Sequence, residues 1–119
     1  RYAPDIVFTH TQADLHQDHS TVTMETLRAF RGISVFGFDV IRSSNGFFPN
    51  FLVKIDEVDV EKKVQALAAY STYKDKYYFS PEITKATLIR NGALAESRYA
   101  EGFEIFRIIG SFGEAVQKE

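Results

Sequence analysis

The sequence predicts a single α/β domain, and two patterns lead to that prediction. Short apolar or alternating runs, typical of strands, are separated by longer segments with helical periodicity. In chain order they predict strand, helix, strand, strand, helix, helix and strand, which indicates an α/β fold with at least one parallel crossover. A chain of 119 residues has the length of one domain rather than two.

The chain opens with a predicted strand and a predicted helix. The nearly continuous apolar run at 5–10 follows a proline and predicts a strand buried on both faces, as in parallel sheets. Apolar residues recur on one side of 20–31, which predicts a helix. Ser20 or Asp18 can accept hydrogen bonds from its first turn, and Gly32 can end it.

Three further strands are predicted from residue type and alternation. Residues 33–42 are rich in β-branched and aromatic side chains, and 51–56 alternate apolar with polar side chains. The turn formers of 43–50 separate them. A last strand is expected around 103–109, and 113–119 read as a frayed tail.

Two helices are predicted between the third and fourth strands. Residues 58–73 show the clearest helical spacing of apolar residues. Within 77–92, Ser80 suits the N-cap, Pro81 suits the first helical position and Gly92 suits the end of the helix.

Composition excludes several classes of protein. Hydrophobic residues make up 45% and charged residues 25% of the chain, and the net charge of −2 is well mixed. No basic stripe indicates a nucleic acid, and no apolar run is long enough to cross a membrane. The chain contains no cysteine, so disulfides and thiolate metal sites are excluded. With no signal peptide in view, we expect a cytoplasmic protein.

The stretch "DLHQDH" at 14–19 concentrates metal-binding and acid–base side chains after the first strand. His16 and His19 can point into one cleft, where neutral imidazoles are common zinc ligands and Asp14 or Asp18 could orient them. Ligands bind beyond the carboxyl ends of strands in open α/β sheets, which is where this loop would lie. A solvated loop with incidental histidines remains an equal alternative. For His10, at the strand end, a structural role is favoured over a place in the cleft.

Several blocks of the chain resemble one family, the LmbE/PIG-L zinc-dependent N-acetylglucosaminyl deacetylases. The first block matches the family's second signature, a strand leading to Asp-His-x-Asp-His. The others follow in the family's order along almost the whole chain. The matching blocks are "PDIVFTHTQADLHQDH", "STVTMETLRAFR", "VIRSSNGFFPNFLVKID", "EKKVQALAAYSTY" and "YAEGFEIFR".

The resemblance implies a Rossmann-like fold, with a mostly parallel sheet flanked by helices, and a hydrolase that removes an N-acetyl group from an amino sugar or sugar conjugate. The family's first signature, Ala-His-Pro-Asp-Asp-Glu, supplies two zinc ligands and the general base, and does not occur here. We therefore expect 1–119 to be the C-terminal part of such a domain. By itself it should be inactive and should need the N-terminal segment, or a homo-oligomer partner, to cover its first strand.

The resemblance also implies roles for individual residues around one zinc ion per complete site. His19 would be a metal ligand. His16 would stabilise or protonate the tetrahedral intermediate, and Asp18 would orient it. Gln17 replaces a proline often found there, which changes no ligand.

Other residues are weaker candidates. The substrate would contact a small group of polar side chains, for which the alternative is an ordinary loop or turn: Asp14, Arg42, Ser43 and Ser44. Glu101 would be a buried structural carboxylate. Tyrosines that could stack on a sugar, with packing as the default, are Tyr70, Tyr77 and Tyr78.

Two other functions are kept open. One is a non-catalytic carbohydrate-binding or assembly module on the same fold, which the absence of the first signature favours. The other is the same zinc chemistry on a different amide, such as a thiol–sugar conjugate. A nucleotide-binding domain is disfavoured, because no glycine-rich phosphate loop follows any predicted strand.

Overall fold

The structure is a computed structural model that describes residues 2–73 and 75–113. Its main elements follow the predicted order of strands and helices. The strands are β1 (Ile6–His10), β2 (Ser34–Phe38), β3 (Phe51–Ile55) and β4 (Tyr99–Arg107). The helices are α1 (Gln17–Ala29), α2 (Glu57–Ala68) and α3 (Pro81–Leu94). Short 3-10 turns lie at Ile41–Ser43, Ser71–Tyr73 and Tyr77–Phe79.

The four strands form one mixed sheet with the order β1-β2-β4-β3. β1 and β2 are parallel, whereas β4 lies antiparallel to both of its neighbours, β2 and β3. The α/β class is therefore confirmed, but the expectation of a mostly parallel sheet is wrong for this chain. The last strand runs between β2 and β3 in the opposite direction, so within residues 2–73 and 75–113 only the β1–α1–β2 unit is a parallel crossover.

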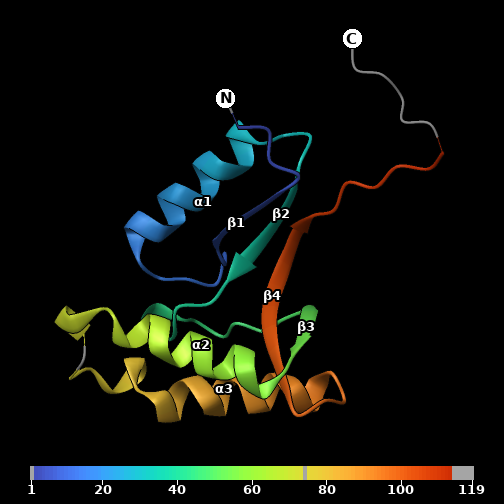
Figure 1. Ribbon diagram of the computed structural model, residues 1–119. Helices are drawn as coiled ribbons and strands as arrows, with labels where there is room; N and C mark the ends of the chain where they lie inside the picture. The colour runs from blue at the N-terminus through green and yellow to red at the C-terminus, as the bar shows by residue number, and fades with distance from the viewer. Residues whose placement is uncertain (1, 74, 114–119) are drawn as a thin grey trace.

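The helices lie in two places around this sheet (Figure 1). α1 packs beside β1, and α3 packs on β4 next to α2. A buried cluster of Val60, Leu88 and Tyr99 has Ile55 packed against it. It joins α2 and α3 to the end of the sheet where β3 ends and β4 begins. Figure 1 shows β2 pointing toward this helical layer, so the loop after β2 connects the two halves of the molecule.

β1 is not buried on both faces, contrary to the prediction for 5–10. It pairs with β2 alone among the described residues and therefore lies at an edge of the sheet. Ile6 and Phe8 are each about half exposed. A continuous apolar strand is buried on both faces only where other strands and helices enclose it on both sides. Among the described residues, they lie on one side of β1.

The start of α1 also differs from the prediction. The helix begins at Gln17, three residues before the predicted start, and its N-cap is His16 rather than Ser20 or Asp18. His16 has an extended backbone, and its Nδ1 accepts a hydrogen bond from the backbone N–H of Asp18 at 3.1 Å. An imidazole nitrogen thus replaces the usual capping oxygen and turns "DLHQDH" from a plain loop into a helix start.

The two later helices confirm some predicted ends and correct others. α3 has Ser80 at the N-cap and Pro81 at its first position, as predicted. α2 stops at Ala68, because 71–73 form a separate 3-10 turn. Gly92 does not end α3, which continues to Leu94.

The last strand starts earlier than predicted. β4 occupies Tyr99–Arg107 rather than 103–109, because its first half pairs with β3 and its second half with β2. The predicted tail lies outside the described residues from 114 onward. Among the helices of the described chain, none combines the length and apolar character needed to cross a membrane.

Candidate metal centre

Three potential metal ligands meet at the carboxyl end of β1. His10 is the last residue of β1, Asp14 lies in the following loop, and His19 lies in the first turn of α1. Each offers one ligand atom, and these atoms lie within 4.8 Å of one another. The sequence predicted a site beyond the end of this strand, and a group of residues that could hold a metal ion lies there.

The loop that carries this group is fixed from the far end of the chain. The Glu104 carboxylate in β4 accepts hydrogen bonds from Thr11 Oγ1 at 2.7 Å, from the Gln12 N–H at 2.9 Å and from Gln12 Nε2 at 2.7 Å. The Thr11 N–H also donates to the carbonyl of Phe38, which extends the β1–β2 pairing by one step. β4 thus determines where the chain leaves β1.

Asp14 is the central anchor of the site. Its side chain is fully buried, and Oδ1 accepts the His16 N–H at 2.8 Å while Oδ2 contacts His19 Nδ1 at 2.8 Å. Burial by itself raises the pKa of Asp14, but the hydrogen bonds from His16 and His19 outweigh it, so the pKa lies below its usual value. The carboxylate is therefore ionised at neutral pH.

The contact with Asp14 determines the tautomer of a neutral His19. A carboxylate only accepts, so the ring proton lies on Nδ1 and Nε2 keeps its lone pair. This carboxylate–imidazole pair is the arrangement that orients metal-binding histidines in many proteins. His19, the residue predicted as a ligand, is thus prepared to bind through Nε2, with Asp14 as its orienting partner.

The three histidines form a stack. The rings of His10 and His19 are parallel within 2°, with centroids 3.8 Å apart, and His16 stacks on the other side of His19 at 4.3 Å. An imidazole binds a metal in its own ring plane, so one ion cannot lie in the planes of two parallel stacked rings. Binding by both His10 and His19 therefore requires one ring to rotate.

His10 belongs to the site, although the sequence favoured a structural role for it. Its Nδ1 is buried and has no hydrogen-bond partner among the described residues. Burial, followed by repulsion from His19, lowers the pKa of His10, which favours the neutral imidazole that a metal requires. Its position at the carboxyl end of a predicted strand was the available signal.

His16 and Asp18 are both exposed at the start of α1, but they interact differently from the prediction. The Asp18 backbone N–H, not its carboxylate, contacts His16 Nδ1. No hydrogen bond or ion pair of the described residues joins the Asp18 carboxylate to His16. Because Nδ1 accepts, the proton of a neutral His16 lies on Nε2, which can donate to a ligand.

Two of the predicted substrate-binding residues lie beside the cluster. Ser44 forms an isolated antiparallel bridge with Asp14, and the Leu15 N–H donates to the Ser43 carbonyl at 2.8 Å. Ser43 Oγ is buried beside the Asp14 carboxylate and helps to lower its pKa. Arg42 is exposed on the preceding 3-10 turn and makes no ion pair within the described chain.

Asp39 is a candidate that sequence reasoning missed. It directly follows β2, whose last residue Phe38 pairs with His10. Burial, as the largest effect, raises the pKa of its carboxyl, although a hydrogen bond from Ser44 opposes this. Oδ1 is buried and has no partner among the described residues. A carboxylate inside the apolar run "ISVFGFDV" was the signal.

Of the remaining predicted residues, Glu101 and Tyr78 line a cavity next to this site. Glu101 is partly buried and pairs with Lys63 at 2.6 Å, so it is less enclosed than expected. Tyr78 lines the cavity, whereas Tyr70 and Tyr77 are exposed.

The fold and this site together assign the protein only to a general class, the α/β domains with a mixed sheet and a candidate metal centre. No protein-family model matches the chain, and no curated protein matches it. The fold is similar to that of the conserved protein TT1542 from Thermus thermophilus, with a TM-score of 0.64 and 22% sequence identity. That match covers 96% of this chain and 57% of TT1542, so the chain spans little more than half of its length.

Proposed function

We propose that this chain carries part of a metal-dependent N-deacetylase that acts on an N-acetylated amino sugar or sugar conjugate. The observation that carries the proposal is the Asp14–His19 contact, which leaves His19 Nε2 available beside a second histidine with a free donor. The family resemblance of "DLHQDH" and the later blocks supports the same reaction.

The residues fit a metal ion in donor type, and they lie close enough together to share one once a stacked ring has rotated. His19 would bind through Nε2 with Asp14 as its orienting carboxylate, and the unpartnered Nδ1 of His10 is a second donor in reach after ring rotation. A catalytic zinc takes about three protein ligands and a water. Bound there, zinc would polarise the amide carbonyl and make its water acidic.

His16 would serve as the oxyanion donor. Its Nδ1 is occupied by the Asp18 N–H, so its Nε2–H is the group that can donate to the charge developing on the amide oxygen. Proton donation to the leaving amine would need a second proton on Nδ1. That proton would face the Asp18 N–H, so His16 must give up its capping contact to act as the acid.

The chain lacks a complete catalytic set by itself. The resemblance places the general base and two further ligands in the first signature, which does not occur in these 119 residues. We therefore propose that a second segment, on the same protein or on a partner, completes the site. The chain alone should bind zinc weakly and release no amine.

Zinc binding is the direct test. In the protein completed by its second segment, we expect one zinc per site by elemental analysis after dialysis against limiting zinc. His19→Ala should abolish binding, and Asp14→Asn should weaken it by about 10-fold to 100-fold because the imidazole loses its carboxylate partner. Gln17→Ala, between the histidines but outside the cluster, is the matched control.

Amine release from N-acetylglucosamine and its conjugates tests the reaction in the complete protein. His19→Ala should remove turnover, and His16→Ala should reduce it about 100-fold or more by loss of the oxyanion donor. Normal turnover of His19→Ala would contradict the proposal. Sugar binding that persists in that variant, with no zinc in the wild type, would favour the non-catalytic carbohydrate module.

A further inference from the structure

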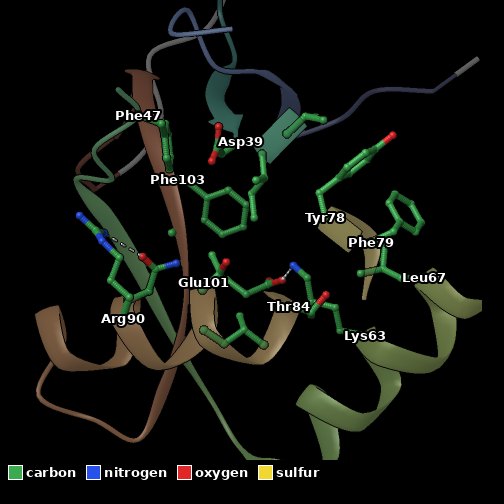
Figure 2. Close-up of a pocket in the computed structure, with 16 residues that line it drawn as sticks. Asp39, Phe47, Lys63, Leu67, Tyr78, Phe79, Thr84, Arg90, Glu101 and Phe103 are labelled. Atoms are coloured by element: carbon green, nitrogen blue, oxygen red, sulfur yellow. Dashed lines mark hydrogen bonds and ion pairs between the residues drawn. The ribbon is translucent and has the colours of Figure 1, made fainter. Parts of the chain in front are cut away.

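A cavity of about 430 Å³ lies next to the metal centre, between the loop after β2, helices α2 and α3, and strand β4. Figure 2 shows aromatic rings on opposite sides of it, with Phe47 and Phe103 facing Tyr78 and Phe79. Leu67 on α2 adds an aliphatic wall. A cavity of this size whose wall surface is mostly apolar is typical of small-molecule sites.

The polar groups of the cavity differ in whether they have partners. The Lys63 ammonium and the Glu101 carboxylate satisfy each other at 2.6 Å (Figure 2). Asp39, at the opposite side in the same view, has its buried Oδ1 unpartnered among the described residues. A buried acceptor without a donor is costly, so a ligand that supplies a hydroxyl or an N–H at this point would bind favourably.

Asp39 also connects the cavity to the metal centre. It follows Phe38, which pairs with His10 in the sheet and whose ring contacts the His10 ring at 4.7 Å. The next turn leads to Ser44, which bridges to Asp14. Asp39 is therefore the cavity residue that follows the strand carrying the His10 contact, and a ligand held at the histidines would have to pass it to reach the aromatic cavity.

We propose that this cavity binds an apolar, ring-sized aglycone attached to the amino sugar, while a sugar hydroxyl donates to Asp39. This inference rests on the proposed function, because the deacetylated sugar would lie at the metal centre. It assigns the substrate to aryl or similarly hydrophobic glycosides rather than to free amino sugars. Aromatic walls stack on such rings, and burying a phenyl group should tighten binding about tenfold or more.

The test compares two glycosides in equilibrium binding by calorimetry, without turnover, on the full chain. Phenyl N-acetyl-β-D-glucosaminide should bind at least about tenfold tighter than the methyl glycoside. Thr87→Phe, which fills the cavity from α3, should reduce this ratio to near one. Ala86→Phe adds the same ring at the exposed neighbouring position and should keep the ratio.

A second pair of variants keeps the test decisive if Thr87→Phe does not fold. Leu67→Trp fills the cavity from α2, and Ala66→Trp is its exposed control. Thermal melts show which variants are folded. Asp39→Ala should weaken both glycosides alike and leave their ratio unchanged. Equal binding of the two glycosides to the wild type, or a ratio that survives cavity filling in a folded variant, would overturn the inference.

His19→Ala separates this inference from the proposed function. A preference for the phenyl glycoside that survives in His19→Ala and disappears in Thr87→Phe supports the cavity, whether or not amine is released. Zinc binding and amine release with no preference for the phenyl glycoside would support the deacetylase and overturn the cavity.

Discussion

Asp14 holds three parts of the candidate site together. Its carboxylate accepts from the His16 backbone and contacts His19, and its carbonyl accepts a hydrogen bond from Ser20 Oγ at 3.3 Å. The loop, the helix start and the candidate ligand are therefore all attached to one buried anion. This arrangement suits Asp14 to orienting the candidate ligand His19, and its place as a substrate contact stays a prediction.

Proton uptake by His10 should make the free energy of unfolding depend on pH. Its pKa in the folded protein is lowered from the usual 6.5, first by burial and then by His19, so the unfolded chain takes up a proton at higher pH than the folded one. Its contribution to stability is therefore present above pH 6.5 and is lost as the pH falls from there through the lower folded value.

Urea unfolding of metal-free protein between about pH 7.5 and pH 5 measures this effect. The wild type should lose stability as the pH falls through this range, and His10→Gln should lose less. Parallel pH profiles for the two proteins would show that His10 does not titrate differently in the folded state.

At the scale of elements, the sequence correctly marked Gly92 as a position that needs glycine, but it assigned the wrong reason, the end of α3. α3 continues past it, and a Cβ at this position would lie 2.5 Å from the Arg98 carbonyl oxygen. Glycine is needed there because the chain returns across the helix toward β4, and the Ser97 N–H donates to the Gly92 carbonyl at 2.9 Å.

Gly92→Ala should therefore destabilise the protein by about 1–3 kcal/mol, since the clash is with backbone that cannot rotate away. The midpoint of urea unfolding measures it. Gly110→Ala is the matched control, because nothing lies within 4 Å of its added Cβ, and it should change stability by less than about 0.5 kcal/mol. Equal effects of the two substitutions would refute the close approach at Gly92.

At the scale of the whole molecule, the position of β1 at the edge of the sheet has consequences for association. Its outer backbone groups face no strand of the described chain, and Ile6 is 51% exposed. Such an edge is a template for pairing with another strand, which lysine side chains disfavour. We expect another segment or a second copy to cover it.

The purified 119-residue chain should therefore self-associate as its concentration rises, and Ile6→Lys should reduce this in sedimentation velocity. Ile89→Lys is the matched control, because Ile89 is similarly exposed at 53% but lies on α3 away from the edge. Association that both variants suppress equally would indicate general surface hydrophobicity rather than strand pairing.

The sequence by itself determined the kinds and order of the main elements, and it predicted the position of the candidate site. Period, turn formers and caps such as Ser80 with Pro81 act over a few neighbouring residues, so they can be read directly. The crowding of "DLHQDH" after an apolar strand was enough to place a candidate centre there.

Only the tertiary structure decided which side chains meet. β4 lies between β2 and β3, Glu104 fixes the site loop, and the segment from Phe38 to Ser44 lies against His10 and Asp14. Such contacts depend on which strands pair and what they bury together, which is a property of residues far apart in the chain. Local sequence patterns do not encode these contacts, and for this reason the contact between His19 and Asp14 was found only in the folded protein.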